Sequence, residues 1–439
     1  MQTIDTLLQA RWIVPIEPEG QVLEHHSLAL HDGRILEILP TEHATQRYSA
    51  AETVILPDHV LLPGLVNTHT HAAMTLLRGV ACDMPLMTWL NEHIWPTEVR
   101  WVSPEFVHAG TELAVLEMLR GGTTCFNDMY FFPDVTAECA ERLGVRAVVG
   151  LVVIDFPSAW AKDADDYLAK GLALHQQLRT SPLVSTMLAP HAPYTVSESV
   201  LVRIREIAEQ YDLRIHMHIH ETASEVDMWQ LQHGERPLAS LDRWGLLSPR
   251  LLATHMTQLT EAEIERFAAV GGHVLHCPES SLKLASGFCP VAKLKAAGIN
   301  VALGTDGAAS NNDLDMFGEA RTAALLGKGV AGDAAALPAP QVLSMATLGG
   351  ARALGLDSEI GSLVPGKAAD IIAVDLATPE TEPIYHGISQ LIYSTARQQV
   401  TDVWVAGQRR IAERHAVGID SDAILTAARA WASKIKSPH

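Results

Sequence analysis

The sequence predicts an α/β fold in which a (β/α)₈ TIM-like barrel is joined to a small β-sandwich domain built from both termini. Two observations support this fold class. Eight short apolar segments alternate with helix-like segments through the middle of the chain, and β-like runs with glycine turns occur at both ends. We expect residues 1–62 and 361–439 to form the two parts of the β-sandwich, with a closing helix in the second, and residues 63–360 to form the barrel.

The first sixty residues alternate short β-like runs with turn signals. Asp32-Gly33, between "SLALH" and "RILEIL", is typical of a hairpin turn. The same alternation of β-like runs and glycine turns occurs in the segments that begin at Gly361 and Val400, and a closing helix is expected within 422–436. Because the ends of a domain often lie close together, both segments are expected to join one β domain.

The middle of the chain contains eight candidate strands, each rich in apolar residues and separated from the next by a helical pattern. The expected strands are 61–71, 123–129, 146–154, 183–192, 213–221, 251–256, 272–279 and 299–307. Helical patterns between them include 103–122, 197–212 and 259–272. Eight strands in this order are enough to close a parallel barrel.

Polar residues occur at the ends of these expected strands. They are His69 and His71 on the first, His191 on the fourth, His218 and Glu221 on the fifth, His255 on the sixth and Asp306 on the eighth. In a (β/α)₈ barrel the carboxyl ends of the strands form the floor of the active site. We therefore expect these side chains to converge, although they are far apart in the sequence.

Part of this set is suited to a metal ion. His69 and His71 are two residues apart, so in a strand they point to the same side. With His218 and Asp306 they would offer three imidazoles and one carboxylate to one divalent ion, Zn²⁺ or alternatively Fe²⁺. Such an ion lowers the pKa of bound water towards neutrality and yields hydroxide as a nucleophile. Glu221 and His255 would remain free to move protons.

Spacing leaves several histidines undecided. His216, His218 and His220 share strand parity, so spacing does not say which of them binds a metal. Glu221 has the opposite parity to His218, so both face the cavity only if strand geometry breaks near His220. We expect His216 and His220 to lie in the barrel interior or to support the ligands. The histidines of the seventh strand, His273 and His276, are expected to have structural or supporting roles.

Four motifs together resemble those of the amidohydrolase superfamily. They are "PGLVNTHTH", "HIHET", "ATHM" and "LGTDGAASNNDLDMFGE". The resemblance covers nearly the whole chain and is strongest to the branch that acts on purines and related rings, in particular to deaminases of 5-methylthioadenosine and S-adenosylhomocysteine. It implies hydrolysis of an adenosine derivative to the inosine analogue and ammonia.

The resemblance also implies roles for individual residues. Residues that match the four expected ligands hold one metal ion in the family, and the fourth strand here offers no lysine or glutamate for a second ion. Glu221 would contact the substrate and protonate the ring nitrogen beside the attacked carbon. His255 would help to deprotonate and orient the water, and Asp306 would carry a proton to the departing amine.

Two further residues match substrate contacts of the family. Glu98 matches a residue that hydrogen-bonds ribose hydroxyls, a sensible task for a carboxylate that accepts from two neighbouring O–H groups. His191 matches a residue that faces the nucleoside. Trp89 and Trp95 could form walls around the purine.

Charge and cysteine content limit the partners. The chain has 51 acidic and 32 basic side chains, a formal net charge of −19, which disfavours nucleic-acid polymers and anionic membranes. Five cysteines without a CxxC pair argue against a disulfide framework. No long apolar segment or leader pattern occurs, so a cytoplasmic protein is expected. The expected partners are a nucleoside substrate and water, and homo-oligomerisation is left open.

Two other hypotheses remain. The same scaffold could deaminate guanine or a pterin, or dechlorinate an s-triazine ring. Alternatively, the chain could be a non-catalytic scaffold of this fold, which would have no reason to keep a complete set of ligands together with Glu221 and His255.

Overall fold

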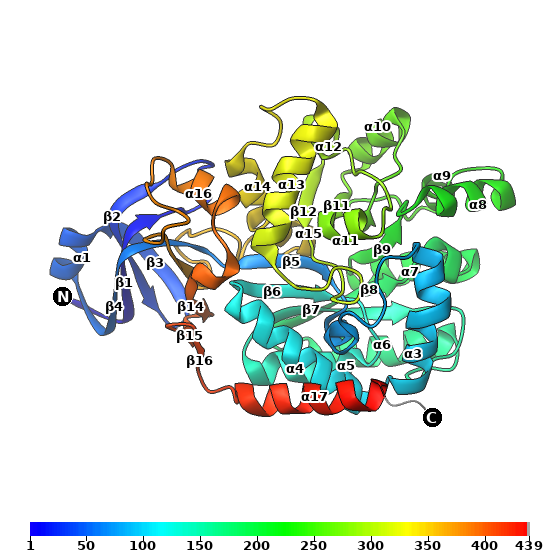
Figure 1. Ribbon diagram of the computed structural model, residues 1–439, viewed down its shortest axis with the longest axis horizontal. Coiled ribbons are helices and arrows are strands. Elements are labelled where there is room, and N and C mark those ends of the chain that lie inside the picture. The colour runs from blue at the N-terminus through cyan, green and yellow to red at the C-terminus, as the bar shows by residue number, and fades with distance from the viewer. Residues whose placement is uncertain (437–439) are drawn as a thin grey trace.

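The computed structural model describes residues 1–436 and places two eight-stranded sheets next to each other (Figure 1). One sheet is a nearly closed parallel barrel whose strands follow one another in sequence order. Its strands are β5 (Leu65–Thr70), β6 (Thr123–Asp128), β7 (Arg146–Val153), β8 (Val184–Pro190), β9 (Ile215–Ile219), β10 (Leu251–His255), β11 (His273–His276) and β12 (Asn300–Leu303). The predicted barrel is confirmed.

The first and last strands of the barrel are joined by hydrogen bonds. The backbone N–H of Asp306 donates to the carbonyl of His69 at 2.9 Å. The hydroxyl of Thr68 donates to the carbonyl of Leu303 at 2.8 Å. These contacts bring the end of β12 next to the end of β5, so the two most distant parts of the barrel sequence share one rim.

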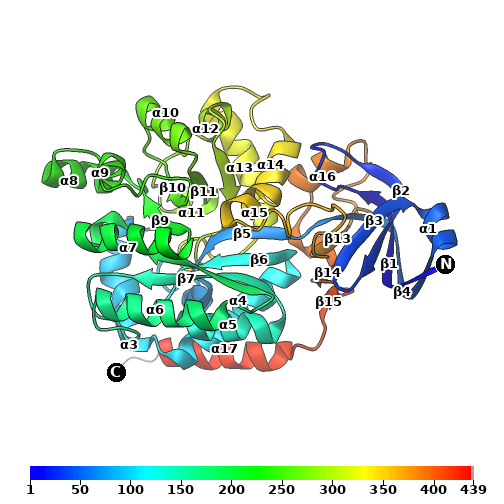
Figure 2. The same ribbon diagram turned by 180° about the vertical axis from the view of Figure 1, so that it is seen from behind.

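Helices and short turns lie between the barrel strands and, from α13 to α15, after the last of them. They are η1 (Ala72–Leu77), α2 (Leu86–Thr88), η2 (Trp89–Ile94), α3 (Trp95–Trp101), α4 (Pro104–Arg120), α5 (Pro133–Leu143), α6 (Ala164–Leu178), η3 (Pro193–Thr195), α7 (Glu198–Tyr211), α8 (Ala223–His233), α9 (Pro237–Arg243), α10 (Glu261–Val270), α11 (Pro278–Lys283), α12 (Val291–Ala296), α13 (Met316–Ala331), α14 (Ala339–Met345) and α15 (Leu348–Leu354). Figure 2 shows α5, α6 and α7 covering one side of the barrel.

The ends of these helices follow from local sequence. Ser103 caps α4 by accepting a hydrogen bond from the N–H of Phe106 at 3.2 Å, and Pro104 occupies the first helical position. Thr260 and Glu263 form a reciprocal capping box at the start of α10. Caps of this kind satisfy backbone groups that the helix itself leaves unpaired.

The second sheet contains strands from both termini, as predicted. Its order is β16-β15-β14-β13-β4-β1-β2-β3. The strands are β1 (Gln2–Ile13), β2 (Leu23–His31), β3 (Arg34–Pro40), β4 (Tyr48–Pro63), β13 (Ile371–Asp375), β14 (Val400–Val405), β15 (Gln408–Ala412) and β16 (His415–Ala416). β2 and β3 form the hairpin expected at Asp32-Gly33. The short elements α1 (Thr41–Arg47), α16 (Gly387–Tyr393) and η4 (Arg397–Gln399) complete this part.

The first expected barrel strand, 61–71, is divided between the two sheets. Leu61, Leu62 and Pro63 end β4 and pair with β13, whereas β5 begins only at Leu65. Gly64 alone separates the two strands. An apolar run that crosses from one sheet into another looks continuous in the sequence, because both halves are buried. The limits 62 and 361 between the domains stay a prediction.

The closing helix α17 (Ser421–Lys436) lies along α4 on the outside of the barrel (Figure 1). Trp431 packs edge-on against Phe106 of α4, with ring centroids 5.3 Å apart. The C-terminal segment therefore contacts both the second sheet, through β13 to β16, and the barrel. Within residues 1–436 there is no helix whose length and apolar character would let it cross a membrane.

Candidate metal and catalytic site

A cavity of about 370 Å³ opens at the carboxyl ends of the barrel strands. Seven of the eight residues predicted for the site line it directly, and the eighth, His69, lies fully buried beneath them. The lining residues are His71, Glu98, His191, His218, Glu221, His255 and Asp306. The convergence expected from the strand ends is therefore present in the structure.

Three imidazoles gather around Asp306. The Nε2 atoms of His69 and His71 lie 3.3 Å and 3.2 Å from Oδ1 of Asp306. His69, His71 and His218 each offer a nitrogen within 4.8 Å of the others, and His69, His255 and Asp306 form a second group by the same measure. Neighbouring atoms at these separations are suited to one cation bound between them.

Hydrogen bonds orient the imidazoles. Nδ1 of His71 lies 2.6 Å from the carbonyl of Met129, and Nδ1 of His218 lies 2.7 Å from the carbonyl of His191. A carbonyl only accepts, so each ring carries a proton on Nδ1 and directs Nε2 at the cluster, where that nitrogen can bind a cation in its deprotonated form. This is the tautomer that a metal ligand needs.

His69 provides the sharpest test of whether a metal ion fits. Its Nδ1 lies 2.9 Å from Nε2 of His216. Its own Nε2 is completely buried and has no hydrogen-bond partner within the described chain. A buried nitrogen without a partner is costly unless another group binds it. Together with the neighbouring imidazoles and the carboxylate, this atom fits a divalent cation.

Asp306 is held as a carboxylate. Although burial alone would raise its pKa, the adjacent imidazoles of His69 and His71 hold the pKa of Asp306 well below its ordinary value. The Ser280 hydroxyl donates to Oδ2 at 2.6 Å, and the Gly307 N–H donates to Oδ1 at 2.7 Å. Asp306 in turn acts on His71. Burial alone would lower the pKa of His71, but the contact with the Asp306 carboxylate raises it to about 9.

Glu221 and His255 lie together beside this cluster. Oε2 of Glu221 is 3.8 Å from Nε2 of His255, and both side chains are almost fully buried. Burial, reinforced by the negative charge of Asp306, raises the pKa of Glu221 to about 8. Burial lowers the pKa of His255 to about 4. At neutral pH the pair therefore consists of a carboxylic acid that can donate a proton and a neutral imidazole that can accept one.

The backbone is strained at three of these positions. His220, His255 and Asp306 have φ values of 54°, 75° and 61°, in the left-handed region that non-glycine residues rarely occupy. The strand geometry does break at His220, as expected, because β9 ends at Ile219. The break turns Glu221 into the same cavity as His218.

The expected substrate contacts lie on another wall of the cavity. Glu98, on α3, accepts a hydrogen bond from the hydroxyl of Tyr130 at 2.7 Å. Burial raises the pKa of Glu98 to about 7, although Tyr130 acts in the opposite direction. His191 follows β8, and burial lowers its pKa to about 3. Trp89 and Trp95 also line the cavity, as expected.

Tyr130 was not identified from the sequence. It lies two residues beyond the end of β6, just as His71 lies at the end of β5, so a search of every strand end would have found it. Ser280 was missed as well. It lies in α11, and only the fold brings its hydroxyl to Asp306.

The four undecided histidines separate into two groups. His216 is buried and contacts His69, and the His220 Nε2 accepts a hydrogen bond from the N–H of Leu238 at 3.2 Å. His276 is buried at the end of β11, where His255 adds to the burial that lowers its pKa to about 3. His273, at the start of that strand, lies away from the site and 3.0 Å from the Arg214 guanidinium.

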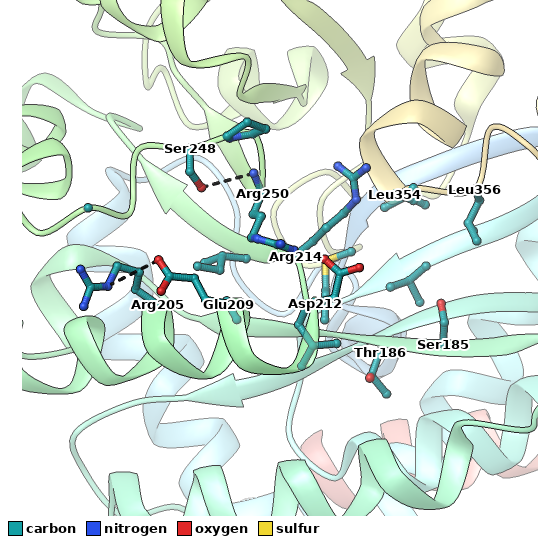
Figure 3. A pocket seen from close by; sticks show the side chains of 18 residues that line it. Ser185, Thr186, Arg205, Glu209, Asp212, Arg214, Ser248, Arg250, Leu354 and Leu356 are labelled. Carbon is teal, nitrogen blue, oxygen red and sulfur yellow. Dashed lines mark hydrogen bonds and ion pairs between the residues drawn. The ribbon is translucent and has the colours of Figure 1, made fainter.

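A second cavity, of about 640 Å³, lies at the opposite end of the barrel strands (Figure 3). Three arginines line it, Arg205, Arg214 and Arg250. The Arg214 side chain lies against the carboxyl end of α15. A Cβ atom added to Gly355, just after that helix, would be only 2.7 Å from Nε of Arg214. A cation beside a helix carboxyl terminus is stabilised by the helix dipole, and Arg250 is also paired with Asp212. These charges have a structural explanation.

The fold agrees with comparisons to known proteins. The chain belongs to the amidohydrolase family, whose profile matches residues 60–410. A 5-methylthioadenosine/S-adenosylhomocysteine deaminase from Teredinibacter turnerae is 47% identical over 99% of this chain and 98% of its own length. A protein of the same name from Thermodesulfovibrio yellowstonii is 41% identical over 98% of this chain and 99% of its own length.

Solved structures of other proteins also resemble this chain. An adenosine deaminase from Xanthomonas campestris with bound zinc matches with a TM-score of 0.98 and 55% identity, covering 99% of each chain. An atrazine chlorohydrolase from Arthrobacter aurescens matches with a TM-score of 0.91 over 97% of this chain and all of its own. The second protein is only 24% identical and therefore indicates a shared fold.

Proposed function

We propose that the protein is a metal-dependent aminohydrolase that converts 5′-substituted adenosines, namely 5-methylthioadenosine and S-adenosylhomocysteine, to inosine analogues and ammonia. The observation that carries this proposal is the cluster of three imidazoles and Asp306 directly beside the Glu221 carboxyl group in one cavity. The names of relatives 41–47% identical over nearly the full chain support the choice of substrate.

We propose that one divalent ion, most simply Zn²⁺, is held by His69, His71, His218 and Asp306. Zinc in the similar deaminase from Xanthomonas campestris supports the choice of metal. When bound, such an ion lowers the pKa of a water molecule towards neutrality. His255 lies close enough to Asp306 to be a further ligand, and we assign it instead to proton transfer because it also lies beside Glu221.

The protein's own residues would then guide the protons. Glu221 would donate its proton to the ring nitrogen next to the carbon under attack, which prevents negative charge from building up on the purine. His255, which is neutral, would accept a proton from the attacking water and orient it. Asp306, a carboxylate, would accept a proton from the hydroxyl group that has added to the purine carbon and pass it to the amine, so that the carbonyl forms as the carbon–nitrogen bond breaks and ammonia leaves.

The outer part of the cavity would bind the nucleoside. The carboxylate of Glu98 would accept hydrogen bonds from the ribose hydroxyls, and the Tyr130 hydroxyl would hold that carboxylate in place. His191, neutral and close to His218, would face the nucleoside. Homo-oligomerisation, a cytoplasmic location and the lack of nucleic-acid partners stay predictions from the sequence.

The experiment that tests this function is an ammonia-release assay on the purified protein with its metal content measured. The substrates are 5-methylthioadenosine, S-adenosylhomocysteine, adenosine, guanine and an s-triazine. Turnover of the adenosines alone supports the proposal, and turnover of guanine or the triazine alone contradicts it. Absence of both metal binding and turnover would instead favour a non-catalytic scaffold.

A further inference from the structure

The mouth of the catalytic cavity is formed by large apolar side chains that remain open to solvent. Val99, Phe156 and Tyr194 all line the cavity, and they are 88%, 46% and 39% exposed. Large apolar groups exposed together at the edge of a cavity indicate a place where a ligand covers them. Behind them Leu86, Trp89 and other apolar residues continue the same wall inward.

Apart from histidine and tyrosine, the ionisable residues that line the cavity are all acidic. Among the described residues that line it, the ionisable side chains other than histidine and tyrosine are Glu98, Glu221 and Asp306, and neither lysine nor arginine occurs. A ligand carboxylate at the mouth of this cavity would therefore find no lysine or arginine of the lining to pair with, and it would lose the part of its water that the apolar wall displaces, which is unfavourable.

Cations next to the lining residues in sequence are engaged elsewhere. The Arg100 guanidinium, beside Val99, stacks over the ring of Trp101 with its carbon 4.9 Å from the centroid. The Lys283 ammonium, beside the lining residue Leu284, donates to the carbonyl of Ala309 at 3.2 Å and also to Asn312. Neither is placed to receive a ligand carboxylate in the cavity.

We infer that the site selects adenosines whose 5′ substituent is small, apolar and uncharged, and that it disfavours a zwitterionic amino-acid tail. This inference rests on the proposed deaminase function and narrows its substrate class. The 5′ end of a nucleoside whose purine lies at the metal cluster and whose ribose lies at Glu98 points away from the cluster, towards the apolar mouth. A methylthio group would cover Val99 and Phe156, whereas a homocysteine tail would bring an unpaired carboxylate there.

The test compares kcat/KM, measured by ammonia release, for three substrates that differ only at the 5′ position. 5-Methylthioadenosine carries a short neutral group, 5′-butylthioadenosine a longer neutral group, and S-adenosylhomocysteine a zwitterion. We expect the butylthio compound within about fivefold of the methylthio compound, and S-adenosylhomocysteine at least about 30-fold below it. Equal use of the methylthio compound and S-adenosylhomocysteine would overturn the inference and leave the deaminase function standing.

The butylthio substrate separates charge from size. If it is disfavoured as strongly as S-adenosylhomocysteine, the cavity selects by length and the role given to charge is wrong. If none of the three substrates releases ammonia while the protein is loaded with metal, the proposed function fails and the inference with it.

A matched pair of variants tests the same point at one position. Val99→Arg places a cation at the mouth, and Val99→Gln adds a shorter polar group without charge. Because Val99 is 88% exposed, neither change should disturb folding. We expect the ratio of kcat/KM for S-adenosylhomocysteine over 5-methylthioadenosine to be at least about fivefold higher in Val99→Arg than in Val99→Gln. An identical ratio in both variants would contradict an electrostatic origin of the selectivity.

Discussion

Glu221 shows how its surroundings set the protonation state of a single side chain. A carboxyl group in water is ionised at pH 7, yet burial and the nearby charge of Asp306 raise the pKa of Glu221 to about 8. The backbone N–H of Glu221 donates to Glu225 at 2.7 Å, which anchors the residue just beyond the break at His220. A neutral carboxyl group in this place is able to donate a proton at neutral pH.

Replacing Glu221 by glutamine should therefore separate metal binding from turnover. The amide has nearly the same volume but no acidic proton, so kcat should fall by about 10²–10⁴-fold. Metal content, measured by elemental analysis, should stay near that of the unchanged protein. The matched control is Asp227→Asn, which changes an exposed carboxyl group of α8 that does not line the cavity. Turnover in Glu221→Gln equal to that of this control would contradict the role.

Glu98 allows a test of pH dependence through stability. Its pKa in the folded protein is about 7, against an ordinary value of 4.5, because burial favours the neutral form. The folded state thus holds a proton that the unfolded state loses between these two values, so stability falls as pH rises through this window.

Glu98→Gln removes this titration. We expect the variant to be more stable than the unchanged protein at pH 8, by roughly 1–3 kcal/mol, and to lose that advantage near pH 4.5. Thermal unfolding measured at both pH values checks the sign. Glu92→Gln, an exposed neighbour, serves as control, and an advantage of Glu98→Gln that is equal at both pH values would show that burial of the charge is not its cause.

At the scale of the elements, the barrel strands were predicted almost completely. Most residues of these strands are buried, because one face of each strand packs inside the barrel and the other against helices, so most of the strands appear as short, largely apolar runs. The prediction erred at 61–71, where β4 and β5 meet at Gly64 and belong to different sheets. The pairing of distant strands decides which residues belong to which sheet, and this pairing cannot be inferred from a local apolar pattern.

The convergence of side chains at the strand ends could be predicted for a related reason. Side chains at strand ends, such as His69 and Asp306, could be grouped because a barrel brings all strand ends to one rim. The break in strand geometry at His220 could be stated only as a condition, because Glu221 and His218 both face the cavity only if the strand ends there. Ser280 and Tyr130 depend on how a helix and a loop pack over the rim, which spacing alone does not determine.

One ion pair joins β7 of the barrel to the segment just before β13 of the second sheet. The Arg146 guanidinium binds both oxygens of Asp370 at 3.0 Å and 3.2 Å, and both residues are buried. The Asp370 carboxylate also accepts from the N–H of Ala406 at 2.8 Å. A paired buried charge becomes costly when its partner is removed.

Arg146→Leu should thus lower the free energy of unfolding by about 3–5 kcal/mol. Urea unfolding followed by circular dichroism measures the loss. The control is Arg142→Leu, which breaks a pair with Glu112 on the surface and should cost at most about 1 kcal/mol. Similar losses in both variants would show that burial does not set the strength of the Arg146 pair.

At the scale of the whole molecule, the proposed metal site couples to stability. Its ligands come from β5, β9 and the segment after β12, so they are assembled only in the folded chain. A ligand that binds only the folded state stabilises it, by about 2.7 kcal/mol at a concentration one hundred times Kd.

Removal of the metal with a chelator should consequently lower Tm, and added Zn²⁺ should restore it. Differential scanning calorimetry on the chelated and reloaded protein measures the shift. His69→Ala is the control, since it lacks the buried Nε2 atom and should show a much smaller response to Zn²⁺. A Tm that does not respond to chelation in the unchanged protein would contradict a tightly held metal at this site.

The direct passage from β4 to β5 has a consequence for how the gene could change. Gly64 fits there because a side chain would collide with Thr124, and β5 starts at once and pairs with β6 from Leu65 onward. Successive residues of a strand face opposite ways, so one extra codon at this joint would turn His69 and His71 towards the helices outside. Most surface loops accept an inserted residue, but an insertion between β4 and β5 would abolish metal binding. We therefore expect the length of this junction to be the same in all functional descendants of the chain.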